Sequence, residues 1–153
     1  MTKRELAASY FTSGYHCAQA VAMAFADEMG MTKETAAKLV CSFGGGMGRL
    51  REVCGAVSAM LFVLGAVYGY DTPETGEKKA EHYARVQDVA LAFEREHDTY
   101  LCRDLLGLGE KRQDPTPAPR TESFYSTRPC PGLIGDAVEQ LERYLASHPA
   151  VEK

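Results

Sequence analysis

The sequence carries no surplus of basic charge. Lysine and arginine total 17 against 21 acidic residues, which gives a formal net charge of -4 and a pI near 5.6. The basic residues are scattered along the chain rather than grouped in a stripe. A nucleic-acid surface needs clustered positive charge, so we expect no nucleic-acid partner.

Long apolar runs are scarce as well. The N-terminal stretch MTKRELAASYF meets charge at once and has no apolar core of a secretory signal, so we expect a cytoplasmic protein. One nearly apolar stretch, Val53–Tyr70, approaches the minimum length of a membrane span. Because it holds three glycines and follows the charged Arg49 and Glu52, a buried core helix is favoured over a membrane span.

Several local signatures are missing. No segment alternates apolar and polar residues over the length of a strand, which argues against a β-sheet. No C-x-x-C is present, which argues against thioredoxin-like and zinc-ribbon sites. Neither G-x-x-x-x-G-K-[ST] nor G-x-G-x-x-G occurs, so nucleotide binding is disfavoured.

Helical signals fill most of the chain. Thr2 and Thr32 are candidate N-caps, Gly30 is a candidate C-terminal stop, and Asp98 is a candidate cap of a short helix. The segment Glu110–Arg120 holds Pro115, Pro117 and Pro119, each two residues from the next, and predicts an extended connection. We predict an all-α, single-domain bundle over residues 1–153 with about seven helices and a central apolar one. The expected helices cover roughly 3–11, 15–29, 33–41, 52–68, a stretch from 73 past 93, 99–106 and 131–147.

Four of the five cysteines fall at predicted helix starts. These four are Cys17, Cys54, Cys102 and Cys130, whereas Cys41 comes late in its helix. The N–H groups and partial positive charge at a helix start favour an anion and lower the pKa of a thiol. The alternative is that each cysteine packs as a small apolar residue. Their spacing means that any cluster must be assembled by the fold.

The stretch FGGGMGRLREVCGAVSA surrounds the second of these cysteines. Its glycines, including Gly45 and Gly46, predict a tight backbone path with positive φ that delivers Cys54 to the other thiols. Arg49 and Arg51 are candidates to stabilise thiolates or an anionic cluster, with a solvated surface role as the alternative. We therefore include Gly45, Gly46 and Arg49 among the cofactor-binding candidates.

In order along the chain, SGYHCAQAV, FGGGMGRLREVCGAVSA, YLCRDLLG and RPCPGLIGDAVE resemble the C_GCAxxG_C_C family of redox-active proteins. The resemblance covers nearly the whole sequence and implies that Cys17, Cys54, Cys102 and Cys130 are the four family cysteines. Cys41 is extra to the pattern. Ala59 stands where the CGAxxG motif has its closing glycine, and its methyl group is expected to narrow any close approach there.

Three functions remain open. In the first, the four cysteines bind an iron–sulfur cluster for electron transfer with a redox partner protein. In the second, the protein is a metal-free thiol–disulfide oxidoreductase or sulfur carrier: a low-pKa Cys54 attacks, Cys17 or Cys102 resolves the disulfide, and a small thiol is the partner. In the third, the cysteines hold zinc or only pack, and the bundle binds a partner.

Two further expectations concern single features. His16 is either a ligand or proton relay beside Cys17, or an exposed histidine without a role, and the latter is favoured. The thin helix surfaces and apolar centre favour self-association, so a homodimer is a further hypothesis.

Overall fold

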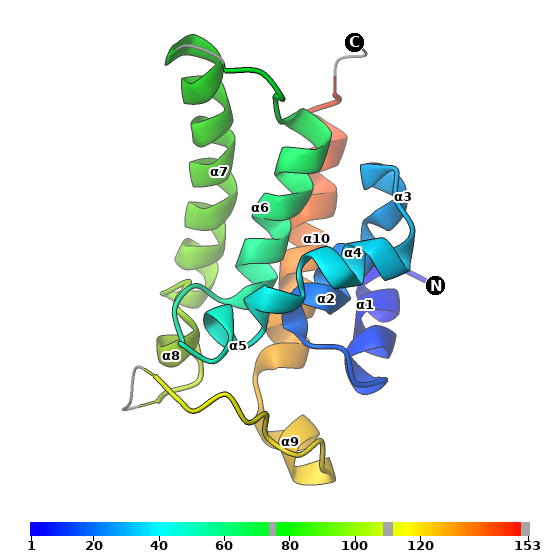
Figure 1. The fold of residues 1–153 in the computed structure, drawn as a ribbon, viewed down its shortest axis with the longest axis vertical. Helices are drawn as coiled ribbons and strands as arrows, with labels where there is room; N and C mark the ends of the chain where they lie inside the picture. Colours follow the sequence, from blue (N-terminus) through cyan, green and yellow to red (C-terminus); the bar gives the residue numbers. More distant parts are fainter. Residues whose placement is uncertain (74–75, 109–111, 151–153) are drawn as a thin grey trace.

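The computed structural model describes residues 1–73, 76–108 and 112–150 (Figure 1). Within these ranges the chain is helical, and the only extended pairing is a single antiparallel bridge between Val53 and Leu101. The all-α prediction is confirmed. The helical elements are α1 (Lys3–Thr12), α2 (Cys17–Ala24), α3 (Ala26–Met29), α4 (Lys33–Leu39), the 3₁₀ turn η1 (Cys41–Phe43), α5 (Gly44–Met47), α6 (Gly55–Tyr68), α7 (Gly76–His97), α8 (Cys102–Leu105), α9 (Glu122–Thr127) and α10 (Cys130–Ser147).

Local sequence signals set several of the helix ends. The Thr2 hydroxyl accepts a hydrogen bond from the Glu5 N–H at 3.0 Å, and the Glu5 carboxylate accepts one from the Thr2 N–H, which completes a capping box. Thr32 caps α4 through the N–H of Thr35. Gly30 ends α3 in the left-handed conformation with φ 71°. The caps predicted at Thr2 and Thr32 and the stop at Gly30 are confirmed.

Other predicted boundaries are wrong. The helix expected over 15–29 begins only at Cys17 and divides at Phe25, whose fully buried side chain accompanies a non-helical backbone. Asp98 does not cap α8, since it has φ 69° and the helix begins at Cys102 after the bridge at Leu101. The start of α7 predicted at Pro73 runs into residues 74–75, which lie outside the described residues.

The apolar helix α6 occupies the centre of the bundle, as predicted. It packs against α2, α7 and α10, and its first half is buried, from Gly55 to Leu64 (Figure 1). Its last turns, which include Gly65 and Ala66, are exposed. No helix in the described part of the chain is both long and apolar enough to cross a membrane.

The starts of α6, α8 and α10 lie at one end of the bundle, where the short helix α5 also sits (Figure 1). A non-helical segment, residues 112–121, crosses this same end on its way to α9. The extended connection predicted for Glu110–Arg120 is confirmed from residue 112 onward, whereas 110 and 111 lie outside the described residues. This end of the bundle is where the cysteines fall.

Candidate functional site

The structure brings four cysteines to one cavity of about 330 Å³. Each stands at a helix start: Cys17 and Cys102 are the first residues of α2 and α8, Cys54 directly precedes α6, and Cys130 is the first residue of α10. All four line the cavity, and all are free thiols. The chain therefore assembles these residues from four separate segments.

The bridge between Val53 and Leu101 positions two of the cysteines. The N–H of Cys54 donates to the carbonyl of Tyr100 at 2.8 Å, and the N–H of Cys102 donates to the carbonyl of Glu52 at 2.6 Å. Because an antiparallel pair holds facing residues in register, the start of α6 and the start of α8 are fixed side by side.

Gly55 allows the third cysteine to approach. A Cβ atom on Gly55 would lie 2.6 Å from the Cys17 Sγ and 2.8 Å from the Phe43 carbonyl oxygen. These distances are shorter than real Cβ atoms show, so only glycine lets the first turn of α6 approach the start of α2 this closely. Gly55, which follows Cys54 in the sequence, therefore helps to set how closely the start of α6 approaches the Cys17 sulfur.

The glycine-rich segment follows a left-handed path. Five consecutive residues, Gly45 to Arg49, have positive φ, and Arg51 has φ 58°. The positive-φ path predicted for Gly45 and Gly46 is confirmed. Gly45 and Arg49 line the cavity, whereas Gly46 does not line it but backs Cys102, since a Cβ there would lie 2.6 Å from the Cys102 Cβ.

Arg51 reaches the sulfur atoms directly. Its side chain is only 4% exposed, its guanidinium Nη1 donates to the Cys102 Sγ at 3.4 Å, and its Nε donates to the Gln113 side-chain oxygen at 2.8 Å. Positive φ in a residue other than glycine destabilises the fold by about 1–2 kcal/mol. The contacts of the Arg51 side chain therefore hold its backbone in this conformation. The sequence left open whether Arg51 acts on the sulfur atoms or lies on the solvated surface, and its burial excludes the surface position.

Burial dominates the electrostatics of the thiols. It raises the pKa of Cys54 far above the ordinary value, and raises that of Cys130 to about 12. The Cys17 pKa is raised by the same cause, although backbone N–H groups of Gly45 and Ala18 act in the opposite direction. The sequence-based expectation of a low-pKa Cys54 is therefore wrong: helix-start N–H groups are present, but the loss of solvent around the sulfur outweighs them.

The cavity wall is positively charged. Its charged side chains are Arg49, Arg51, Arg120 and Arg128, and no aspartate or glutamate of the described residues lines it. This arrangement stands out in a chain whose net charge is -4. The cavity therefore favours negative charge, from thiolates or from a ligand.

The sulfur atoms are not packed as tightly as one small ion requires. Among the described residues, no three of the cysteine sulfurs lie within 4.8 Å of one another. Four thiolates around one zinc ion, each at about 2.3 Å, would stand roughly 3.8 Å apart. The spacing here is wider.

Residues 112–120 cover the cavity. The Gln113 N–H donates to the Arg49 carbonyl at 3.0 Å, and the Arg49 Nε donates to the Asp114 carbonyl at 2.8 Å. Pro115 and Pro117 then contribute to the lining. We call residues 112–120 the proline strap. Nothing in the spacing of its prolines indicated that it would close over the cysteines.

His16, which lines the cavity, also contacts Cys41, which does not. The His16 Nδ1 accepts from the Gln19 N–H at 3.3 Å and so caps α2, while Nε2 lies 3.0 Å from the Cys41 carbonyl oxygen. Both ring nitrogens are thus engaged, so a role for His16 as ligand or relay is not supported. Cys41 is exposed in η1 and does not line the cavity. Ala59 is fully buried in α6, where its methyl group is accommodated.

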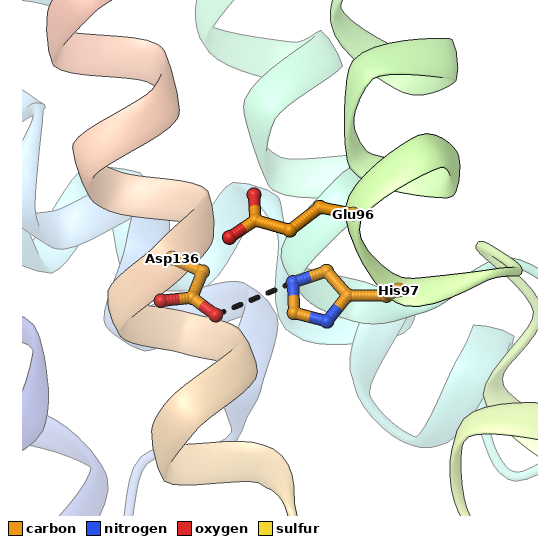
Figure 2. A group of neighbouring side chains, drawn as sticks. All are labelled: Glu96, His97 and Asp136. Atoms are coloured by element: carbon orange, nitrogen blue, oxygen red, sulfur yellow. Dashed lines mark ion pairs between the residues drawn. The ribbon is translucent and has the colours of Figure 1, made fainter.

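A second group of polar side chains lies elsewhere. Glu96, His97 and Asp136 place their ligand atoms within 4.8 Å of one another between α7 and α10 (Figure 2). The His97 Nε2 stands 3.3 Å from one Asp136 oxygen, and Arg4 pairs with the other at 3.0 Å. We interpret this group as an ion-pair network that joins α1, α7 and α10, because Arg4 already supplies the cation.

Gly55→Ala is expected to destabilise the protein by about 1–3 kcal/mol, because the added methyl group overlaps the Cys17 sulfur and a backbone oxygen. The matched control is Gly65→Ala in the same helix, where nothing lies within 4 Å of the added atom. That change should stabilise the helix by about 0.4–1 kcal/mol. Urea unfolding followed by circular dichroism measures both, and equal effects of the two changes would contradict the tight approach of α6 to α2.

Alkylation of the metal-free, reduced protein tests the buried thiols. With Cys41→Ser as background, iodoacetamide at pH 8 should modify Cys130 on the order of a thousandfold more slowly than free cysteine, since a pKa of about 12 leaves little thiolate. Cys54 should be slow for the same reason. Mass spectrometry of peptides over time gives each rate. A rate at Cys54 above that of free cysteine would instead support metal-free thiol chemistry.

Comparison with known proteins gives one family and no individual relative. No curated protein matches the chain, and no solved structure matches it. A family model described as "Putative redox-active protein (C_GCAxxG_C_C)" matches residues 15–144. This range takes in all four cysteines of the cavity and most of the chain. The protein therefore belongs to the C_GCAxxG_C_C family of redox-active proteins.

Proposed function

We propose that Cys17, Cys54, Cys102 and Cys130 together bind an iron–sulfur cluster, and that the protein transfers electrons to a redox partner protein. The observation that carries the proposal is the convergence of four thiols, two buried and two half-buried, from four helix starts on one cavity lined by arginines. Four thiolates are the ligand set of [2Fe–2S] and [4Fe–4S] clusters. Such a cluster supplies one-electron chemistry when bound.

The charge balance of the cavity supports this assignment. Ionising one of the thiols raises the pKa of its neighbours, as Cys17 does for both Cys54 and Cys130. Four thiolates therefore need compensating positive charge, which metal ions provide on replacing the thiol protons. Arg51 adds a fixed positive charge with its hydrogen bond to the Cys102 sulfur.

The spacing of the sulfur atoms favours a cluster over one zinc ion. In a [4Fe–4S] cluster each sulfur ligand binds a different iron atom, so the ligands stand farther apart than those of one ion. No three of the described cysteine sulfurs lie within 4.8 Å of one another, which favours such a cluster over a single zinc ion. The high thiol pKa values likewise disfavour attack by a free Cys54 thiolate with Cys17 as its resolving partner.

The surroundings of the sulfur atoms would tune the potential. Backbone N–H groups of Ala56 and Val57 act on Cys54, and those of Ala18 and Gly45 act on Cys17. Hydrogen bonds to the sulfur ligands stabilise the more negative, reduced form and raise the reduction potential. The proline strap and the bundle keep water from most of the centre. A reducing compartment such as the cytoplasm would keep five cysteines free for this role, and self-association remains a prediction.

Anaerobic purification tests the proposal. We expect visible charge-transfer absorbance, with iron and acid-labile sulfide in equal amounts. Serine at any of the four cavity cysteines should remove most of the iron, whereas Cys41→Ser should retain it because Cys41 lies outside the cavity. A colourless preparation with stoichiometric zinc would support the structural alternative instead. Protein without any metal, even after reconstitution with iron and sulfide, would refute the cluster.

Arg51→Gln should lower the midpoint potential of the loaded protein by about 50–100 mV. The change removes a buried positive charge and the hydrogen bond to the Cys102 sulfur, and 59 mV corresponds to a tenfold change for one electron. Positive φ strains the backbone of glutamine as much as that of arginine, so the substitution leaves this strain unchanged. Arg143→Gln, an exposed change on α10, is the control. A redox titration of samples with equal iron content decides, and an unchanged potential would assign Arg51 a structural role.

A further inference from the structure

We propose that the cavity also binds a small organic acid, held by Arg128 and Arg49 beside the cysteine centre. The proposal rests on the proposed function in one respect only, namely that the bound acid would lie beside a redox-active sulfur centre. The binding itself follows from features of the cavity that do not need a cluster. It would make the protein one that acts on or senses a small molecule, rather than an electron carrier alone.

The first feature is an arginine whose charge is not neutralised. The Arg128 guanidinium lies 5.0 Å from the centre of the Phe124 ring, and it makes no hydrogen bond or ion pair with any described residue. By contrast, Arg120 donates to the carbonyls of Phe11 and Tyr15. Arg128 lines the cavity, and no described residue accepts a hydrogen bond from its guanidinium.

The second feature is repulsion between like charges across the cavity. The pKa of Arg49 is lowered, first by burial and then by the charges of Arg51 and of Arg128. The Asp114 carboxylate acts on Arg49 in the opposite direction, but no carboxylate of the described residues lines the cavity itself. Arg51 donates to the Cys102 sulfur. A cluster held by thiolates would offset part of the charge, and an anion between Arg49 and Arg128 would offset the rest.

The third feature is the size and character of the walls. A volume of about 330 Å³ lies in the range of small-molecule sites, about 300–1,000 Å³. It is far larger than an inorganic oxyanion requires. Much of the wall is apolar, from Phe11, Leu105, Leu106, Pro117, Phe124 and Leu133. An apolar cavity with a few placed guanidinium groups fits an acid with an apolar body, in which a carboxylate accepts bidentate hydrogen bonds.

The position of the cavity would bring such an acid to the sulfur atoms. Arg128 stands two residues before Cys130, and both line the cavity, as does Cys54. The proline strap closes the same space through Pro115 and Pro117, and it is anchored to Arg49 by two hydrogen bonds. A ligand on Arg49 would therefore also contact the segment that covers it.

Isothermal titration of the anaerobically purified full chain tests the proposal. The probes are acetate, hexanoate and phenylacetate, with hexanamide and phenylacetamide as neutral counterparts and sulfate as an inorganic anion. We expect at least one of the two larger acids to bind ten times more tightly than its amide, and more tightly than acetate or sulfate. Arg128→Gln should abolish the preference for acid over amide, and Arg128→Lys should restore part of it. Arg143→Gln, on the exposed side of α10, should change nothing.

Several outcomes would overturn the proposal. These are no binding of any acid at 10 mM, equal affinity for acid and amide, sulfate binding as tightly as the larger acids, or an Arg128→Gln variant that is folded by circular dichroism and binds normally. Iron content measured on the same samples separates the two proposals. Acid binding by protein that stays iron-free after reconstitution with iron and sulfide would refute the cluster alone, and iron-replete protein without acid binding would refute only the organic-acid site.

Discussion

The close approach of α6 to α2 is the constraint on which the site depends. A methyl group on Gly55 would occupy the space of the Cys17 sulfur, so the two helix starts meet only because this residue has no side chain. The bridge at Val53 and Leu101 then fixes α8 against the same point. With these contacts in place, the long apolar helix α6 serves two purposes: its stretch from Gly55 to Leu64 fills the core, and the residue that precedes it, Cys54, is one of the four cysteines.

Burial decides how Cys17, Cys54 and Cys130 behave. At an exposed helix start, N–H groups and the helix dipole would favour thiolates. Here the same N–H groups are present, but the loss of solvent destabilises the thiolate form by more than these N–H groups stabilise it. Each neighbouring sulfur raises the thiol pKa further. The raised pKa values of Cys17, Cys54 and Cys130 mean that the arginines of the wall face few thiolates until cations or ligands enter. This imbalance connects the two proposals, since one supplies positive charge to the sulfur atoms and the other supplies negative charge to the arginines.

The sequence predicted the helices that have strong local signals, and it located the cysteines at helix starts. Thr2, Thr32 and Gly30 act through their own side chain or backbone, so their roles are visible without tertiary structure. The break at Phe25 and the left-handed Asp98 depend on burial and on a contact between distant segments, which no local pattern records. Similarly, the glycines indicated a path of positive φ, but only the fold shows that Arg51 is buried against Cys102 and that the proline strap covers the cavity.

The four cysteines come from segments that span residues 17 to 130 of the chain. Anything that binds all four at once closes long loops between them, and the unfolded chain loses entropy with each loop closed. A group bound at this end of the bundle would therefore raise the free energy of unfolding of the whole molecule. Loss of the bound group, for example by oxidation, would then shorten the lifetime of the whole protein, so that its abundance in a cell would itself report on exposure to oxygen.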